Sequence, residues 1–139
     1  MTAPVDRYRA GIETLLALSP GRAHLISDAL AAEAPEFARL MVEFAFADIF
    51  TRPGLDLRAR LFVAIGALAA QGGAPAQLRW FVGSALANGV RTGEVIEALM
   101  QVSLFAGFGS AANALEVCRD QLADQRAGES CPVPAAASR

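Results

Sequence analysis

Residues 57–89, LRARLFVAIGALAAQGGAPAQLRWFVGSALANG, decide the fold. Apolar residues occupy almost every side of the stretch from Leu57 to Ala70, which predicts a buried helix. Gln71-Gly72-Gly73 then breaks the chain, and Pro75 suits the first turn of a second helix, where its missing N–H costs nothing. Asn88-Gly89 predicts the end of that helix, because glycine readily adopts the left-handed conformation of a helix C-cap.

Helix start and stop signals continue on both sides of this stretch. Asp56 is a natural N-cap for the buried helix, and Thr92 for a later helix that Gly107 ends. Apolar residues recur at three-to-four spacing throughout, whereas no stretch alternates with the period of two that strands require. The sequence therefore predicts an all-α protein of about six or seven helices. Their expected ranges are 6–17, 23–30, 35 to before 52, 57 to about 70, 75–87, 92 to before 107, and about 110–125.

The third of these helices carries a regular apolar pattern after Pro35, which suits its first turn. Five apolar residues recur there with helical spacing, and this pattern predicts one apolar face. They are Phe37, Leu40, Met41, Phe44 and Ala45.

The size and composition of the chain predict one domain that associates with other subunits. Its 139 residues suit a single hydrophobic core. Apolar residues make up 54% and charged residues only 19%, which is more apolar than a monomer of this size can bury. We expect residues 1–127 to form the domain, and residues 128–139, rich in proline, alanine and serine, to form a flexible tail.

Several classes of protein are excluded by the same sequence. The apolar run from Leu61 to Ala70 is shorter than the roughly 18 residues that cross a bilayer. The start shows no secretory signal, so a cytoplasmic location is predicted. A net charge of −2 without an Arg cluster argues against nucleic acid as a partner. Cys118 and Cys131 fit neither a redox pair nor a zinc pattern, so no metal is expected.

Three segments, in this order and spacing, carry a resemblance to a known family. They are residues 44–56, FAFADIFTRPGLD; residues 78–89, LRWFVGSALANG; and residues 94–107, EVIEALMQVSLFAG. The chain from about Pro35 to Cys118 thereby resembles the carboxymuconolactone decarboxylases. The resemblance implies an AhpD-like all-α fold with a central helical hairpin, assembled as a homo-oligomer, often a trimer or hexamer.

One branch of this family reduces hydroperoxides with a reactive thiolate. That branch uses a glutamate, a C-x-x-C pair, and a histidine four residues after the second cysteine. The matching positions here hold Leu61, Gly73, Ala76 and Trp80. Because glycine and alanine carry no sulfur, the resemblance excludes a thiol peroxidase of this type.

The decarboxylase branch needs no metal or organic cofactor, because the carbonyl of its lactone substrate accepts the electron pair left when carbon dioxide departs. The protein has to hold carboxylates, polarise the carbonyl and deliver a proton. The usual histidine, tryptophan and tyrosine of this branch are replaced here by Trp80, Phe50 and Phe105. The resemblance therefore implies a cofactor-free enzyme whose pocket is more apolar than the prototype's.

Three charged residues are candidates for the chemistry, each with a structural alternative. Arg52 lies in a turn between two helices, where it either binds a substrate carboxylate in bidentate fashion or holds carbonyl groups at the helix end. Glu43 and Asp48 are candidate acids. Otherwise they face solvent or pair with an arginine such as Arg58 or Arg60.

Three aromatic residues are candidates for the walls of the pocket. Trp80 either stacks on a planar ligand or fills a core or subunit contact. Phe50 and Phe105 either shape the pocket or pack as phenylalanines at helical spacing usually do.

We predict a lyase-like or isomerase-like enzyme of aromatic compound metabolism that acts on a small organic acid or lactone. In this hypothesis Arg52 anchors a substrate carboxylate, while Glu43 or Asp48 moves a proton. One alternative is a natural-product tailoring enzyme for a bulkier aromatic or polyketide-like substrate. Another is a non-catalytic ligand-binding oligomer.

Overall fold

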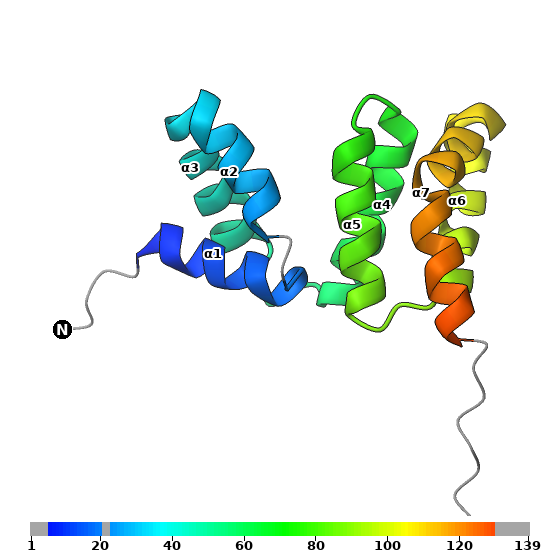
Figure 1. Ribbon diagram of the computed structural model, residues 1–139, viewed down its shortest axis with the longest axis horizontal. Helices are drawn as coiled ribbons and strands as arrows, with labels where there is room; N and C mark the ends of the chain where they lie inside the picture. Colours follow the sequence, from blue (N-terminus) through cyan, green and yellow to red (C-terminus); the bar gives the residue numbers. More distant parts are fainter. Residues whose placement is uncertain (1–5, 21–22, 130–139) are drawn as a thin grey trace, which may run out of the picture. The chain divides into compact units, whose positions relative to one another are not determined.

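The structure of this chain is a computed structural model that describes residues 6–20 and 23–129 (Figure 1). Seven α-helices and one π-helical segment make up this part of the chain, which contains no strand. The predicted all-α class and AhpD-like fold are therefore confirmed. None of the described helices has the length and apolar character needed to cross a membrane.

The chain divides into two compact units, residues 1–61 and residues 62–139. The first unit contains α1 (Arg7–Leu18), α2 (Ala23–Glu33), α3 (Pro35–Met41) and the π-helix η1 (Val42–Ile49). The second contains most of α4 (Leu57–Gln71), together with α5 (Pro75–Ala87), α6 (Thr92–Ala106) and α7 (Phe108–Glu129). The single domain over residues 1–127 stays a prediction, and residues 130–139 of the predicted tail lie outside the described part.

In the first unit, α1 packs closely against η1. Asp6 caps α1, because its side chain accepts a hydrogen bond of 3.3 Å from the backbone N–H of Arg9. Gly11 lies where the two helices meet: a Cβ atom at this position would be only 2.5 Å from the carbonyl oxygen of Val42. The absence of a side chain at Gly11 thus sets how closely α1 approaches η1.

The predicted third helix is present, but its geometry changes part-way along. It begins at Pro35 as expected and passes from α3 into η1 after Met41. The N–H of Phe50 donates to the carbonyl of Ala45 at 2.9 Å, which is a π-type bond to the fifth residue back. Apolar periodicity does not reveal this wider turn.

The apolar face expected on this helix is not the buried one. Phe37, Leu40 and Phe44 are exposed, whereas the buried apolar residues are Ala38, Val42 and Phe46. The packing of α1 on η1 buries Val42, because this residue lies where Gly11 of α1 meets the helix. Phe37, Leu40 and Phe44 remain exposed.

Helix α4, which starts in the first unit and continues in the second, begins as predicted and buries only one side. The carboxylate of Asp56 accepts a hydrogen bond of 2.7 Å from the N–H of Ala59, which caps the helix. Leu61 and Ile65 are buried, but Val63 is 65% exposed. The prediction that this helix is buried all round is therefore wrong.

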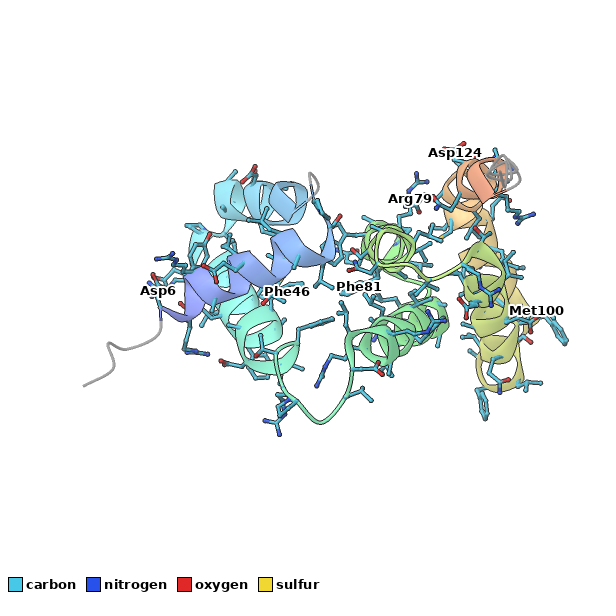
Figure 2. The ribbon with its side chains drawn as sticks, turned by 90° about the horizontal axis from the view of Figure 1, so that it is seen from below. Asp6, Phe46, Arg79, Phe81, Met100 and Asp124 are labelled. Carbon is cyan, nitrogen blue, oxygen red and sulfur yellow. The ribbon has the colours of Figure 1, made fainter. Side chains whose placement is uncertain are left out.

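The hairpin of α4 and α5 lies beside α7 (Figure 1). Residues of these three helices line a small cavity of about 20 Å³. Arg79 projects from α5 toward α7 (Figure 2) and donates to the carbonyl of Val117 at 3.1 Å. In return, Gln121 donates to the carbonyl of Arg79 at 2.9 Å. These reciprocal bonds join α5 to α7.

Glycines end two helices of the second unit where the sequence predicts them. Gly89 follows α5 with φ 86°, and Gly107 follows α6 with φ 89°. Both values lie in the region that glycine adopts without strain. The predicted Thr92 cap is wrong by one residue, because Arg91 is the N-cap of α6 and its N–H donates to Glu94 at 3.0 Å.

Candidate functional site

The two candidate acids share one arginine, Arg7, which projects from α1. Its Nε donates to Oδ1 of Asp48 at 3.2 Å, and its Nη2 donates to Oδ2 of the same carboxylate. Its Nη1 lies 3.5 Å from Oε2 of Glu43. Arg39 completes the group by donating to Oε1 of Glu43 at 2.8 Å. Two guanidinium groups therefore neutralise two carboxylates, and we call these four residues the acid cluster.

The acid cluster is ordered by helix geometry as well as by charge. Arg39 lies one turn before Glu43, so their side chains meet along the same helix face. The hydrogen bond to Glu43, and then the charge of that carboxylate, raise the pKa of Arg39 above its ordinary value. Asp48 raises the pKa of Arg7 in the same two ways. Both arginines thus stay charged throughout the range in which proteins remain folded.

The two acids differ in their access to solvent. The side chain of Glu43 is 12% exposed, whereas that of Asp48 is 39% exposed. The sequence suggested Arg58 or Arg60 as ion-pair partners of these acids. In the structure, Arg7 and Arg39 bind them instead. Of the two carboxylates, that of Asp48 is the more accessible to solvent.

Arg52 lies in the turn after η1, and its backbone is held there by Arg60. Nη2 of Arg60 donates to the carbonyl of Arg52 at 2.7 Å, and its Nε donates to the carbonyl of Leu55 at 3.0 Å. Within the described part of the chain, no acceptor holds the guanidinium of Arg52 itself. Arg60, and not Arg52, is therefore the arginine that holds carbonyl groups of this turn.

Phe50 belongs to the interior of the first unit. Its ring stacks on that of Phe46, with centroids 5.4 Å apart and an angle of 23° between the planes. Phe46 is buried and Phe50 is half-buried. Of the two roles that the sequence left open for Phe50, pocket wall or packing, the structure shows packing.

Trp80 and Phe105, the remaining candidates, both belong to the second unit but differ in exposure. Trp80 is 5% exposed and meets Phe81 edge to face, with ring centroids 4.9 Å apart. Phe105 is 85% exposed and lies on α6. Trp80 therefore behaves as a core residue, while Phe105 is free to meet a ligand or another molecule.

Phe105 stands at the edge of an apolar groove between α4 and α6, which we call the α4–α6 groove. The groove has a volume of about 540 Å³, and Gln101 is the one polar side chain among the described residues that line it. Residues that line it include Phe62, Val63, Gly66, Ala67, Val102 and Phe105. Such a groove suits an apolar ligand that a single amide orients.

Neither thiol nor metal chemistry finds support among the described side chains. Cys118 is fully buried in α7, and burial raises the pKa of its thiol to about 11. Since the thiolate is the reactive form, this residue is poorly suited to nucleophilic work. No group of three His, Cys, Asp or Glu residues gathers within residues 6–20 and 23–129. Cys131 lies outside those ranges.

Comparison with known proteins identifies the family. The sequence profile described as "Carboxymuconolactone decarboxylase family" matches residues 35–120. This chain belongs to the carboxymuconolactone decarboxylase family. It is also similar to a protein of Paracoccus denitrificans described as "Uncharacterized 15.0 kDa protein in nqo9-nqo10 intergenic region". The two are 35% identical over 118 residues, which cover 84% of this chain and 88% of the relative.

The structure places the four positions that the resemblance assigns to the thiol peroxidase motif, Leu61, Gly73, Ala76 and Trp80, around the α4–α5 hairpin. Leu61 and Trp80 are buried, whereas Gly73 and Ala76 are exposed at the turn between the helices.

The residues of the acid cluster that sequence reasoning missed are Arg7 and Arg39. Arg39 carries a local signal, because an arginine one turn before a glutamate forms a standard helix pair. Arg7 has no such local signal in the sequence, because 41 residues separate it from Asp48. Only the packing of α1 on η1 brings Arg7 to the acids.

Proposed function

We propose that this protein is a cofactor-free enzyme that acts on a small organic acid or lactone, by decarboxylation or isomerisation. The observation that carries the proposal is the guanidinium of Arg52, which lacks an acceptor among the described side chains although Arg60 holds its backbone. A guanidinium held in this way matches a substrate carboxylate with two parallel hydrogen bonds. Family membership supports the same reading.

In the proposed reaction, Arg52 orients a carboxylate of the substrate while the bond to the departing carbon dioxide breaks. The electron pair of that bond moves into the system conjugated with the lactone carbonyl, and a proton then adds to carbon. Asp48, which is more exposed than Glu43, is the residue we assign to proton transfer. Glu43 acts as a positioning residue, because it holds Arg7 and Arg39.

The test is turnover of carboxymuconolactone by the full chain, followed by release of carbon dioxide. Wild-type protein is expected to consume the lactone, and Arg52→Ala to abolish the reaction. Arg9→Ala is the matched control, since Arg9 is an exposed arginine whose one ion pair among the described residues is with Glu13, one turn away. Absence of turnover by the wild-type protein contradicts the proposal.

A second candidate function rests on the α4–α6 groove. Its volume of about 540 Å³ and almost wholly apolar lining favour a bulkier, less polar substrate, such as an aromatic or polyketide-like molecule. A Cβ atom at Gly66 would lie 3.8 Å from Val102, so Gly66→Ala fits, whereas Gly66→Leu would fill the groove.

This second candidate is tested by calorimetric titration with planar aromatic ligands and with small diacids. Binding of the aromatic ligands alone, retained by Gly66→Ala and lost in Gly66→Leu, would support it. Binding of diacids alone favours the first function. Analysis of the recovered ligand separates an enzyme from a binding protein, because a binding protein returns its ligand unchanged.

A further inference from the structure

Gln101 supplies the polar group of the α4–α6 groove. It is exposed on α6, and no described group forms a hydrogen bond with its side-chain amide. The other described residues that line the groove are apolar and belong to α4 and α6, within the second unit. An amide carries two N–H donors and one acceptor oxygen, so Gln101 is available for either kind of hydrogen bond with a ligand.

The surroundings of Gln101 provide no cation for an acidic ligand. No charged residue occurs between residues 61 and 78 or between residues 98 and 115, the stretches that contain every described residue of the groove. The nearest charge along α6 is that of Glu97, which is exposed and forms no ion pair with a described residue. Glu97 lies one turn before Gln101, on the same side of the helix. A ligand carboxylate beside Gln101 would therefore meet a like charge and no compensating cation.

The rest of the groove favours a flat apolar ring system. Its volume of about 540 Å³ lies within the range of small-molecule pockets, about 300–1,000 Å³. Gly66 and Ala67 leave space beside α4, while Phe105, which is 85% exposed, supplies an aromatic wall. Aromatic rings stack with their faces offset or meet edge to face. A planar aromatic ligand would cover Phe105 and remove both apolar surfaces from water.

We propose that Gln101 determines the specificity of the α4–α6 groove for a neutral, planar aromatic ligand with one hydroxyl or carbonyl group. The amide donates to the carbonyl oxygen or accepts from the hydroxyl, and the ring system lies on the apolar walls. An ionised carboxylate at the same position loses hydration without gaining a cation, which costs free energy. This inference rests on the second candidate function, in which the groove is the site, and adds the charge and the polar group of the ligand.

Four naphthalene derivatives of similar shape test this specificity by calorimetric titration of the full chain near neutral pH. They are 2-naphthamide, 2-naphthoate, 2-naphthylmethylammonium and 2-methylnaphthalene. Wild-type protein is expected to bind the neutral 2-naphthamide at least about 10-fold more tightly than the anionic or the cationic derivative. 2-Methylnaphthalene has no polar group, so it reports on the apolar walls alone.

Two variants of Gln101 separate its hydrogen bonds from its place in the helix, since leucine and lysine both favour helices. Gln101→Leu removes the hydrogen bonds and should weaken binding of 2-naphthamide about 5-fold, without weakening binding of 2-methylnaphthalene. Gln101→Lys places a cation beside the groove, so 2-naphthoate should now bind more tightly than 2-naphthamide. Gln77→Lys is the matched control, because Gln77 is exposed on α5 and does not line the groove.

A preference for 2-naphthamide in the wild-type protein and in Gln77→Lys, together with the reversed preference in Gln101→Lys, supports the proposal. Equal affinities of the wild-type protein for 2-naphthamide and 2-naphthoate overturn it. Tighter binding of the cationic derivative, or an unchanged preference in Gln101→Lys, also overturns it. In these cases the second candidate function stands, because the protein still binds aromatic ligands. If none of the four compounds binds the wild-type protein, the second candidate function fails together with this proposal.

Discussion

Arg7 holds Asp48 through two atoms of its guanidinium, although 41 residues separate the two in sequence. The same arginine lies 3.5 Å from Glu43, so one side chain of α1 joins both candidate acids. Because Arg7 and both acids belong to the first unit, this contact ties the amino-terminal helix to the π-helix η1. The acid cluster is therefore part of the packing of that unit as well as a candidate site.

We predict that Arg7→Ala lowers the melting temperature by several degrees, and by more than Arg9→Ala does. The first change leaves both oxygens of Asp48 without the cation that holds them, whereas Arg9 forms an exposed ion pair with Glu13 one turn away. Thermal unfolding followed by circular dichroism measures both variants. The difference between them should shrink at high salt, because salt screens exposed charges. Equal melting temperatures would show that Arg7 does not join the two helices.

We predict that Gly11→Ala destabilises the fold by about 1–3 kcal/mol, because the new methyl group overlaps its neighbours. Its Cβ atom would lie 2.5 Å from the carbonyl oxygen of Val42 and 2.6 Å from its Cγ1. Gly93→Ala is the matched control, because a Cβ atom added at this helical glycine would have nothing within 4 Å. Alanine there should stabilise the folded protein by up to about 1 kcal/mol. Urea unfolding gives both free energies. A stabilised Gly11→Ala variant contradicts the close approach of α1 to η1.

We predict that stability falls as the pH rises from about 9 to about 11, through the buried thiol of Cys118. Burial raises the pKa of this thiol from 9.0 to about 11, so the folded state keeps its proton where the unfolded state loses it. The stabilisation is complete below the unfolded pKa and disappears as the pH rises through the folded value. Each pKa unit corresponds to about 1.4 kcal/mol, so the loss approaches about 3 kcal/mol.

The measurement is urea unfolding between pH 8 and about pH 11 in a Cys131→Ser background, which leaves one thiol to titrate. The matched variant adds Cys118→Ala, and the difference between the two unfolding free energies isolates Cys118. Arg7 and Arg39 do not contribute here, because their carboxylate partners raise their pKa values further above this pH range. A difference that stays constant with pH would refute the role of the buried thiol.

We predict that Arg60→Ala raises the KM of the proposed substrate about 10-fold while kcat changes less. Arg60 does not bind the substrate in our proposal; it donates to the carbonyls of Arg52 and Leu55 and so holds the turn that presents Arg52. Loss of these bonds should weaken carboxylate binding, and Arg60→Lys should restore part of it. Steady-state kinetics provide both constants. A fall in kcat at unchanged KM would place Arg60 in the chemical step instead.

The sequence determined the elements of this fold because their ends depend on local chemistry. Asp56 caps α4 with a bond to Ala59, Pro75 opens α5, and Gly89 ends it with a positive φ. Each of these features involves residues within a few positions of one another, so a single stretch of chain contains all the information. The family could be recognised for the same reason, since its motifs are short strings in a fixed order.

The tertiary structure alone decided which residues meet. The apolar pattern of the third helix suggested a face containing Phe37 and Phe44, but the close approach of α1 at Gly11 buried Val42 instead. Arg7 reached the acids, Trp80 became a core residue, and Phe105 remained exposed. Burial and ion pairing depend on which elements come together in space. No local sequence pattern indicates a contact between residues 41 positions apart.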